Sequence, residues 1–368
     1  MLRLVRIVVA LSGGVDSAVA AARLQRDGAD VVAVHYRTGV VASDPASASA
    51  ARSCCGAEDA RDARAVAARL GVPFYVLDVA DAFQRDVVGD FVAAYATGRT
   101  PNPCIVCNQT VKFGRLAERA RGMGAEAVAT GHYARTALRA DGGVRLCRAT
   151  DRRKDQSYVL YGLTQAQLAL ARFPLGDARK DEVRDEARAL GLVVADKPDS
   201  QELCFVPTGD HRDVLAERAP GLLREGPVVD AQGHELGRHR GAAAYTVGQR
   251  RGLGIASTEP LHVTAVDPAR DRVEVGPRAA CLRRTVETAP LHWVGVAPEE
   301  GRRRSPWRVT VRIRHAHEPE PATLCVDERG GGVVRFDAPV FAPAPGQALV
   351  AYDGDDVLAG APIERSAP

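Results

Sequence analysis

Three cysteines are the residues of this sequence that could most readily do chemistry. Cys104 and Cys107 stand at CxxC spacing in TPNPCIVCNQTVKF, and Cys204 stands in the distant segment KPDSQELCFV. A zinc half-site would need a second CxxC pair, which the sequence lacks. A thioredoxin-like redox pair remains open, as does a nucleophile assisted by Cys204. In the latter case one thiol would carry a persulfide and the other would assist its release.

The reactivity of Cys107 depends on the helix that we expect over TVKF. A helix N-terminus carries a partial positive charge, which stabilises a thiolate. We therefore expect Cys107 at the start of this helix. Another pair, Cys54 and Cys55, precedes a helix in a long loop and is interpreted as local structure.

A glycine-rich turn forms a second candidate site, in LSGGVDSAVAA. Gly13 and Gly14 would let phosphate oxygens approach backbone N–H groups, and the following helix adds about half a positive charge there. Asp16 could hold Mg²⁺ between phosphates. The sequence lacks GxxxxGK[ST], so no P-loop lysine is expected. Gly131 in ATGHYA would end a strand at the same edge and let a nucleotide approach the backbone.

Lysine is rare in this chain, whereas arginine is abundant. The compact ammonium of lysine and the planar guanidinium of arginine are not equivalent at a tight site. The few lysines are therefore candidates for specific roles: Lys112, Lys154, Lys180 and Lys197.

The first half of the sequence alternates apolar strands with amphipathic helices, which indicates a parallel sheet covered on both faces. We predict a doubly wound α/β domain whose ligands bind at the carboxyl ends of the strands. Helices are also expected over LTQAQLALARF, with Thr164 and Gln167 at capping-box spacing, and over RKDEVRDEARALG. The strands are expected at residues 5–11, 29–36, 72–79 and 125–134.

Helical periodicity fades after Pro207, and short alternating strands follow. We expect an α/β domain over residues 1–206, a small β-rich central domain over 207–280 and a C-terminal β-barrel over 281–368. In WRVTVRIRH the apolar and polar residues alternate. Its polar face carries Arg308, Arg312 and Arg314, which could track nucleic-acid phosphates.

The composition is that of a globular protein of 368 residues, with 46% hydrophobic and 26% charged residues and a net charge of +3. So small a charge does not by itself indicate a nucleic-acid partner. No apolar run approaches the roughly 20 residues that span a bilayer. The N-terminus does not match an export signal, so we expect a cytoplasmic protein with reduced thiols and no membrane partner.

Six motifs in this order resemble the tRNA-specific 2-thiouridylases of the MnmA/TrmU type, within the PP-loop ATP pyrophosphatase superfamily. They are SGGVDS, GRTPNPCIVCNQTVKF, ATGHY, KDQSYVLYGL, DSQELCF and TVGQRRGLGI. The resemblance implies that ATP with Mg²⁺ adenylates O2 of the wobble uridine of a tRNA. Sulfur from a persulfide, loaded by an upstream sulfur-donor protein, then attacks C2, a disulfide or its equivalent forms, and AMP leaves.

The resemblance also implies roles for individual residues. Cys107 matches the catalytic nucleophile, and Cys204 matches the cysteine that receives sulfur. The matching ATP-binding positions are Ala10, Leu11, Ser12, Gly13, Gly14, Val15, Asp16, Ser17, Tyr36 and Gly131. The positions matching contacts to the target base or the rest of the tRNA are Asn102, Pro103, Cys104, Lys154, Asp155, Gln156, Arg314 and His315.

One position departs from part of the family, because some members carry an aspartate where this chain has Cys104. A thiol titrates nearer pH 8.5 and is a different acid. An alternative hypothesis is that Cys104, Cys107 and Cys204 ligate an iron–sulfur cluster with one open iron. Two other classes also remain: an ATP pyrophosphatase acting on a small molecule, and a non-catalytic RNA-binding protein with a cysteine-bound metal.

Overall fold

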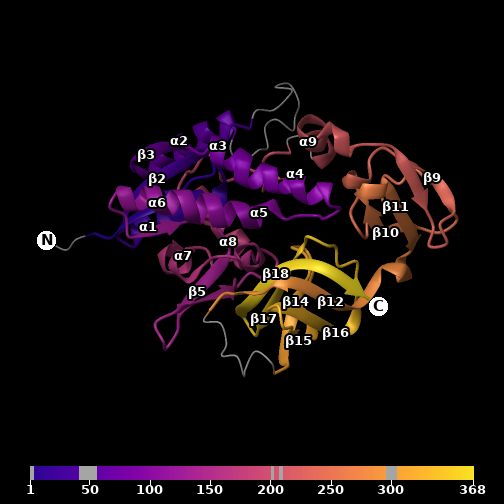
Figure 1. Ribbon diagram of the computed structural model, residues 1–368. Coiled ribbons are helices and arrows are strands. Elements are labelled where there is room, and N and C mark those ends of the chain that lie inside the picture. The colour runs from indigo at the N-terminus through magenta and orange to yellow at the C-terminus, as the bar shows by residue number, and fades with distance from the viewer. Residues whose placement is uncertain (1–3, 41–55, 200–202, 207–209, 296–304) are drawn as a thin grey trace. The chain divides into compact units, whose positions relative to one another are not determined.

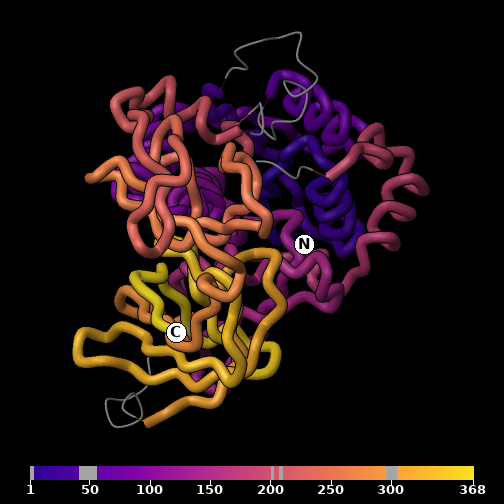
Figure 2. Tube along the Cα trace, turned by 90° about the vertical axis from the view of Figure 1, so that its right-hand side faces the viewer, coloured from indigo at the N-terminus to yellow at the C-terminus, as the bar shows by residue number. Residues whose placement is uncertain are grey.

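The structure is a computed structural model that describes residues 4–40, 56–199, 203–206, 210–295 and 305–368. The chain divides into two compact units (Figure 1; the chain path can be followed in Figure 2). The first unit comprises Met1–Val88, Cys104–Gly209 and Asp355–Val357, and the second comprises Gly89–Pro103, Asp210–Gly354 and Leu358–Pro368. Cys54 and Cys55 lie outside the described residues.

A five-stranded parallel sheet organises the first unit, in the order β3-β2-β1-β4-β7. This confirms the predicted α/β class. Because β2 and β4 flank β1 on opposite sides, the carboxyl end of β1 is the switch point where such sheets bind ligands. The strands are β1 (Arg6–Ala10), β2 (Asp30–Arg37), β3 (Phe74–Asp78), β4 (Ala127–Ala129) and β7 (Ala171–Arg172).

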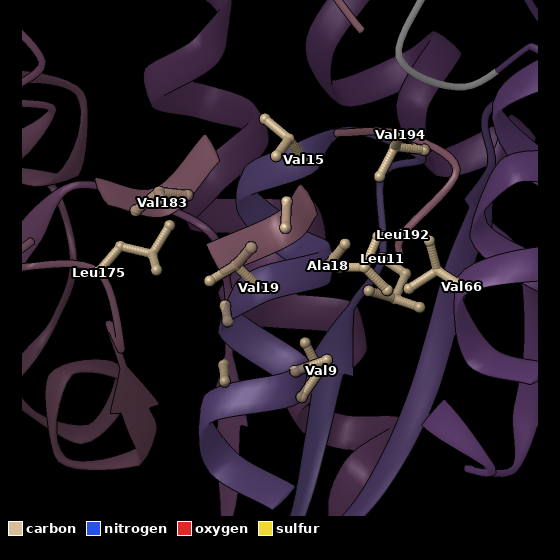
Figure 3. Packing of buried hydrophobic residues seen from close by; sticks show 14 of the residues in the cluster. Val9, Leu11, Val15, Ala18, Val19, Val66, Leu175, Val183, Leu192 and Val194 are labelled. Carbon is tan, nitrogen blue, oxygen red and sulfur yellow. The ribbon is translucent and has the colours of Figure 1, made fainter. Parts of the chain in front are cut away.

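Three helices pack into the core of this unit: α1 (Val15–Arg26), α2 (Ala57–Leu70) and α8 (Lys180–Ala189). Figure 3 shows how Val19 of α1, Val66 of α2 and Val183 of α8 lie among the buried side chains. Gly71 ends α2 in the left-handed conformation, with φ 67°. These helices fix the position of the turn that follows β1.

The helix that carries the CxxC pair begins earlier than expected. It runs without a break through α5 (Pro103–Cys107), the π-helical segment η3 (Asn108–Arg115) and α6 (Leu116–Gly122). The prediction that Cys107 starts this helix was therefore wrong, because Pro103 occupies the first position, where a missing N–H costs nothing. Cys104 is the second residue of the helix and Cys107 is the fifth.

The capping box of α7 (Gln165–Leu170) is confirmed, because Thr164 Oγ1 accepts a hydrogen bond from the Gln167 N–H at 3.2 Å. The helix ends sooner than its sequence pattern suggests. Ala171 and Arg172 instead form β7 at the edge of the sheet, where they pair with β4. The remaining elements of the first unit are α3 (Ala80–Ala82), η2 (Phe83–Val88), β5 (Ala134–Leu138), β6 (Val144–Arg148) and η4 (Ser157–Leu160).

The second unit is mostly β-structure, as predicted, and contains a small sheet and a closed barrel. The helix α9 (His211–Arg218) was not expected from the sequence. The small sheet has the order β10-β11-β8-β9, and the barrel runs β12-β16-β15-β14-β17-β18 and closes by pairing β12 with β18. In the part of the chain that the structure describes, no helix is long and apolar enough to cross a membrane.

The bounds of these elements are as follows. The first group is α4 (Gly89–Ala96), η5 (Pro220–Leu222), β8 (Gly226–Val229), β9 (Glu235–His239), η6 (Ala242–Ala244), β10 (Leu261–Asp267), η7 (Pro268–Arg270), β11 (Arg272–Pro277) and η8 (Arg278–Cys281). The barrel and its additions are β12 (Leu282–Pro290), β13 (His292–Trp293), β14 (Trp307–Arg312), β15 (Glu320–Val326), β16 (Gly331–Phe341), β17 (Ala348–Asp353) and β18 (Asp356–Ala367).

Candidate functional site

The turn between β1 and α1 is closely surrounded by backbone from other segments. Gly13 has φ 78°, and a Cβ atom added to it would lie 2.5 Å from the Asp59 carbonyl oxygen. A Cβ atom added to Gly131 would lie 2.6 Å from the Ser17 nitrogen. Both positions therefore require glycine, and the segment after β4 lies against the first turn of α1.

Two serines brace this turn from inside. The Ser17 hydroxyl accepts a hydrogen bond from the Ser12 N–H at 3.1 Å and donates to the Gly14 carbonyl at 3.1 Å. Gly14 is the N-cap of α1 and offers no side-chain acceptor to the first N–H groups of the helix. A helix start of this kind attracts anions. Tyr36, at the carboxyl end of neighbouring β2, is buried.

Asp16 in the first turn of α1 is held by two side chains that are distant in the sequence. Lys180 Nζ lies 2.7 Å and 2.8 Å from the two carboxylate oxygens of Asp16, and the Tyr133 hydroxyl donates to it at 2.8 Å. Burial and the neighbouring Asp16 carboxylate raise the pKa of Tyr133 well above its ordinary value, so its hydroxyl stays protonated. Helix α8 thus places a lysine, Lys180, beside this turn.

Asp199 is the second acidic residue on Lys180, and it gathers three cationic side chains. Lys154 Nζ lies 2.7 Å from one carboxylate oxygen, while Lys180 Nζ and Arg184 Nη2 each lie 2.8 Å from the other. Burial raises the pKa of Asp199, but hydrogen bonds from Lys154 and Lys180 outweigh it and bring the pKa to about 2. Asp199 is therefore ionised at neutral pH.

A third lysine ties the turn to α2. Lys197 Nζ donates to the Gly13 carbonyl at 3.1 Å and to the Asp59 carboxylate at 2.7 Å, and it also contacts Asp62. Three of the four lysines thus gather around the turn and its acidic partners. Sequence reasoning did not assign Lys180, Lys197, Asp199 or Tyr133 to this site, although the rarity of lysine was a signal for the first two.

The segment matched to a tRNA contact contains one side chain suited to that role and two that are engaged internally. The Asp155 carboxylate is fully buried and accepts from the Ala149 N–H and the Ser157 hydroxyl, both at 3.0 Å. Gln156 accepts from the Tyr133 N–H at 2.9 Å. Lys154 is the most available of the three, since 36% of its side chain is exposed.

The residues after Cys107 attach its helix to the KDQSYVLYGL segment. Asn108 donates to the Val159 carbonyl at 2.9 Å, and Gln109 donates to the Gly162 carbonyl at 2.8 Å. A Cβ atom at Gly162 would lie 1.9 Å from Gln109 Nε2, so the contact requires glycine. These bonds fix the helix from its buried side and connect the two motifs.

None of the three site cysteines is in a disulfide bond in the structure. Cys104 is exposed, whereas Cys107 and Cys204 are partly buried. Among the residues that the structure describes, no group of three or more His, Cys, Asp or Glu side chains is arranged to hold a metal ion. Asn102, just before the helix, is partly buried, and Pro103, its first residue, is buried.

On strand β14 the predicted alternation holds for the apolar side, where Val309 and Val311 are buried in the barrel core. The predicted arginine stripe was wrong in part. Arg312 is only 6% exposed and donates to the His317 carbonyl at 2.9 Å, and Arg308 is paired with Asp337. Just beyond the strand, Arg314 lies over the Phe341 ring and donates to the Phe341 carbonyl, and His315 is exposed.

Family models match three consecutive parts of the chain. They are a tRNA methyl transferase HUP domain at residues 5–208, a tRNA methyl transferase PRC-barrel domain at 212–277 and an aminomethyltransferase β-barrel domain at 283–363. Among solved structures, a 4-thiouridine synthetase–RNA complex with bound ATP aligns with 54% of this chain and 44% of its own. Its identity is 18% and the TM-score is 0.37, a distant and partial match.

Curated relatives match the chain along nearly its whole length. The tRNA-specific 2-thiouridylase MnmA of Methylorubrum extorquens is 47% identical over 98% of this chain and 94% of its own. The protein of the same name from Chloroflexus aurantiacus is 46% identical over 98% of both chains. The phosphate-type turn and the three cysteines also lie in one unit, as the resemblance requires. Because of this whole-length similarity, the chain belongs to the tRNA-specific 2-thiouridylase family.

Proposed function

We propose that this protein is a tRNA-uridine 2-sulfurtransferase, which activates the wobble uridine with ATP and replaces O2 with sulfur from a cysteine persulfide. The observation that carries the proposal is the turn after β1, lined by Gly13, Gly14 and Gly131, in the unit that also contains Cys107 and Cys204. Whole-length similarity to 2-thiouridylases supports the choice of substrate over a small molecule.

The turn suits the triphosphate of ATP, because α1 begins there and no side chain caps its first N–H groups. We assign ATP to Ala10–Ser17, Tyr36 and Gly131. Asp16 fits Mg²⁺, which favours a carboxylate together with substrate phosphates, provided that Lys180 then releases Asp16. When bound, Mg²⁺ would neutralise phosphate charge.

Adenylation begins when O2 of the uridine attacks the α-phosphorus of ATP. The bond from that phosphorus to the bridging oxygen breaks, and pyrophosphate leaves with the electron pair. Charge develops on the leaving group, so the α1 N–H groups and Lys180 stabilise the transition state more than the ground state. The product is a uridine whose O2 carries AMP, which makes C2 open to attack.

Sulfur transfer then uses two cysteines. The terminal sulfur of a persulfide on Cys204 attacks C2, and AMP departs with O2. The Cys107 thiolate attacks the Cys204 sulfur and releases 2-thiouridine, and a Cys107–Cys204 disulfide takes the two oxidising equivalents. Reduction by an external thiol and a new persulfide from a sulfur-donor protein complete the cycle.

The tRNA must present its wobble base outside the stack, which is inexpensive in a single-stranded anticodon loop. We assign Asn102, Pro103 and Cys104 to the target base, and we assign the Lys154–Gln156 segment, Arg314 and His315 to the rest of the tRNA. For Lys154–Gln156 the contact goes through Lys154, because the other two side chains are used internally. We further propose a cytosolic location, where tRNA is modified and thiols are kept reduced.

The test is a reaction of the purified protein with Mg-ATP, a persulfide donor and unmodified tRNA. We expect AMP release that depends on tRNA, together with 2-thiouridine detected by mass spectrometry of the digested RNA. A tRNA whose wobble uridine is replaced by cytidine is the matched control and should yield neither product. Equal AMP release without tRNA would contradict the proposal and favour a small-molecule substrate.

A further inference from the structure

One carboxylate is shared between the nucleotide site and the lysine assigned to RNA. Asp199 binds Lys180 through one oxygen, at 2.8 Å, and Lys154 through the other, at 2.7 Å. Lys180 in turn binds Asp16 in the phosphate turn at 2.7 Å. A continuous chain of ion pairs therefore runs from the first turn of α1 to a partly exposed lysine.

The shielding of these groups makes their ion pairs strong. The side chains of Lys180 and Asp199 are 11% and 22% exposed, so water screens their attraction only partly. Lys180 is also paired with Asp16, and Arg184 is a third cation on Asp199. Removal of either lysine leaves the Asp199 charge less compensated, so its hold on the other lysine becomes tighter.

Both expected ligands are polyanions that compete with Asp199 for a lysine. The phosphates of ATP draw Lys180 towards the turn, and an RNA phosphate draws Lys154 outwards. Each withdrawal strengthens the grip of Asp199 on the remaining lysine. The geometry therefore predicts negative coupling between the sites, because occupation of one site makes the lysine of the other site less available.

We propose that Asp199 is a positioning residue that couples the two substrates antagonistically, so that bound nucleotide weakens RNA binding through Lys154 and bound RNA loosens nucleotide through Lys180. This inference rests on the proposed function, which supplies the two ligands. By linkage the two effects are equal. In the reaction cycle, the RNA contact at Lys154 would thereby promote the departure of pyrophosphate and AMP.

The test measures the affinity of fluorescently labelled unmodified tRNA with and without saturating Mg²⁺ and α,β-methylene-ATP, which cannot be cleaved at the reacting bond. The ratio of the two dissociation constants is the coupling factor. Direct contact between the nucleotide and the uridine adds a favourable contribution, so the comparison is between variants. The factor is the dissociation constant of tRNA with nucleotide divided by that without it. In Asp199→Asn we expect this factor to be ~10-fold lower than in wild type, because nucleotide no longer weakens tRNA binding; tenfold is a typical coupling.

Two further variants separate coupling from a general loss of structure. Lys154→Met removes the cation on the RNA side, so it should shift the factor as Asp199→Asn does. Because Asp199 then holds Lys180 more tightly, nucleotide affinity in the absence of RNA should fall. Combining the two substitutions should add nothing further, because both break one chain of contacts. Asp196→Asn is the matched control, because Asp196 is exposed and pairs with Arg188, and it should retain the wild-type factor.

The outcomes distinguish this inference from the function on which it rests. A coupling factor that is the same in wild type, Asp199→Asn and Lys154→Met, with both ligands bound, would overturn the inference and leave the function intact. Wild-type protein that binds neither ligand would overturn both. Thermal unfolding of each variant confirms that it is folded, and Lys154→Met keeps the test decisive if Asp199→Asn is not.

Discussion

Replacement of Cys107 or Cys204 with serine is expected to lower 2-thiouridine formation by roughly 10³-fold or more, the scale of losing a catalytic nucleophile. A serine hydroxyl cannot carry a persulfide and is not ionised at neutral pH. tRNA-dependent pyrophosphate release should persist in both variants, because adenylation uses the phosphate turn and neither thiol, whereas AMP stays on O2 until sulfur attacks C2. Quantification of pyrophosphate and thiolated nucleoside in the same reaction separates the two half-reactions.

Two other cysteines provide the controls. Cys325 lies on β15 in the second unit, so Cys325→Ser should leave the yields of pyrophosphate and 2-thiouridine unchanged. Cys104→Ser keeps a small polar side chain at the target base, so it should retain most of the thiolation, because the two-cysteine mechanism does not use the Cys104 sulfur. If Cys104→Ser loses thiolation as completely as the other two, and anaerobically purified wild type contains iron, the cluster hypothesis replaces the persulfide mechanism. Thiolation that survives in Cys204→Ser would likewise contradict the proposed cycle.

Replacement of Lys180 with methionine is expected to lower kcat/KM for ATP by ~10²–10³-fold in the AMP-forming reaction. Lys180 is the cation between Asp16 and Asp199, and without it two carboxylates face the incoming phosphates with less compensation. Breaking a buried ion pair from one side costs about 3–5 kcal/mol. The effect should be on adenylation itself, measured as pyrophosphate release, unlike that of the cysteine substitutions.

Helix α8 offers a matched control on its exposed side. Arg188→Met removes a cation that pairs with Asp185 and Asp196 away from the turn, and it should change kcat/KM by less than about twofold. Lys180→Arg keeps the charge but has a larger head group, so it should restore only part of the rate. A folded Lys180→Met variant with wild-type ATP kinetics would contradict the assigned role of Lys180.

The sequence was sufficient for the elements and the motifs, because their signals are local. Apolar runs and glycine stops predict the first four strands of the sheet, and alternation in WRVTVRIRH predicts the buried side of β14. The turn after β1 was recognisable from SGGVDS alone. The exceptions are small elements. In β7, pairing with β4 overrides the local helical preference, and α9 begins at an Asp210 cap that the sequence analysis did not single out.

The ion-pair network could not be predicted, because its members are far apart along the chain. Lys180 and Asp16 are separated by 164 positions, and Lys197 and Gly13 by 184. Sequence patterns do not specify which of many acidic residues a lysine will meet. The rarity of lysine was informative only because arginine fills most other basic positions.

Arg312 illustrates the opposite error, in which a correct local pattern led to a wrong function. Strand alternation places it on the polar face, yet the chain beyond β14 turns back and offers carbonyl oxygens at His315 and His317. A guanidinium that donates hydrogen bonds to buried carbonyl oxygens stabilises the fold more than one left in solvent, because an unsatisfied buried acceptor is costly. Burial of this kind depends on a turn whose course is set by tertiary packing.

The most direct test of the account follows the oxygen that sulfur replaces. An anticodon stem-loop carrying [2-¹⁸O]uridine at the wobble position would be reacted with Mg-ATP and a persulfide donor, and the AMP would be analysed by mass spectrometry. Adenylation at O2 predicts that every AMP formed with a 2-thiouridine carries ¹⁸O in its phosphate. AMP without ¹⁸O, in amounts equal to thiolated product, would contradict the adenylation mechanism.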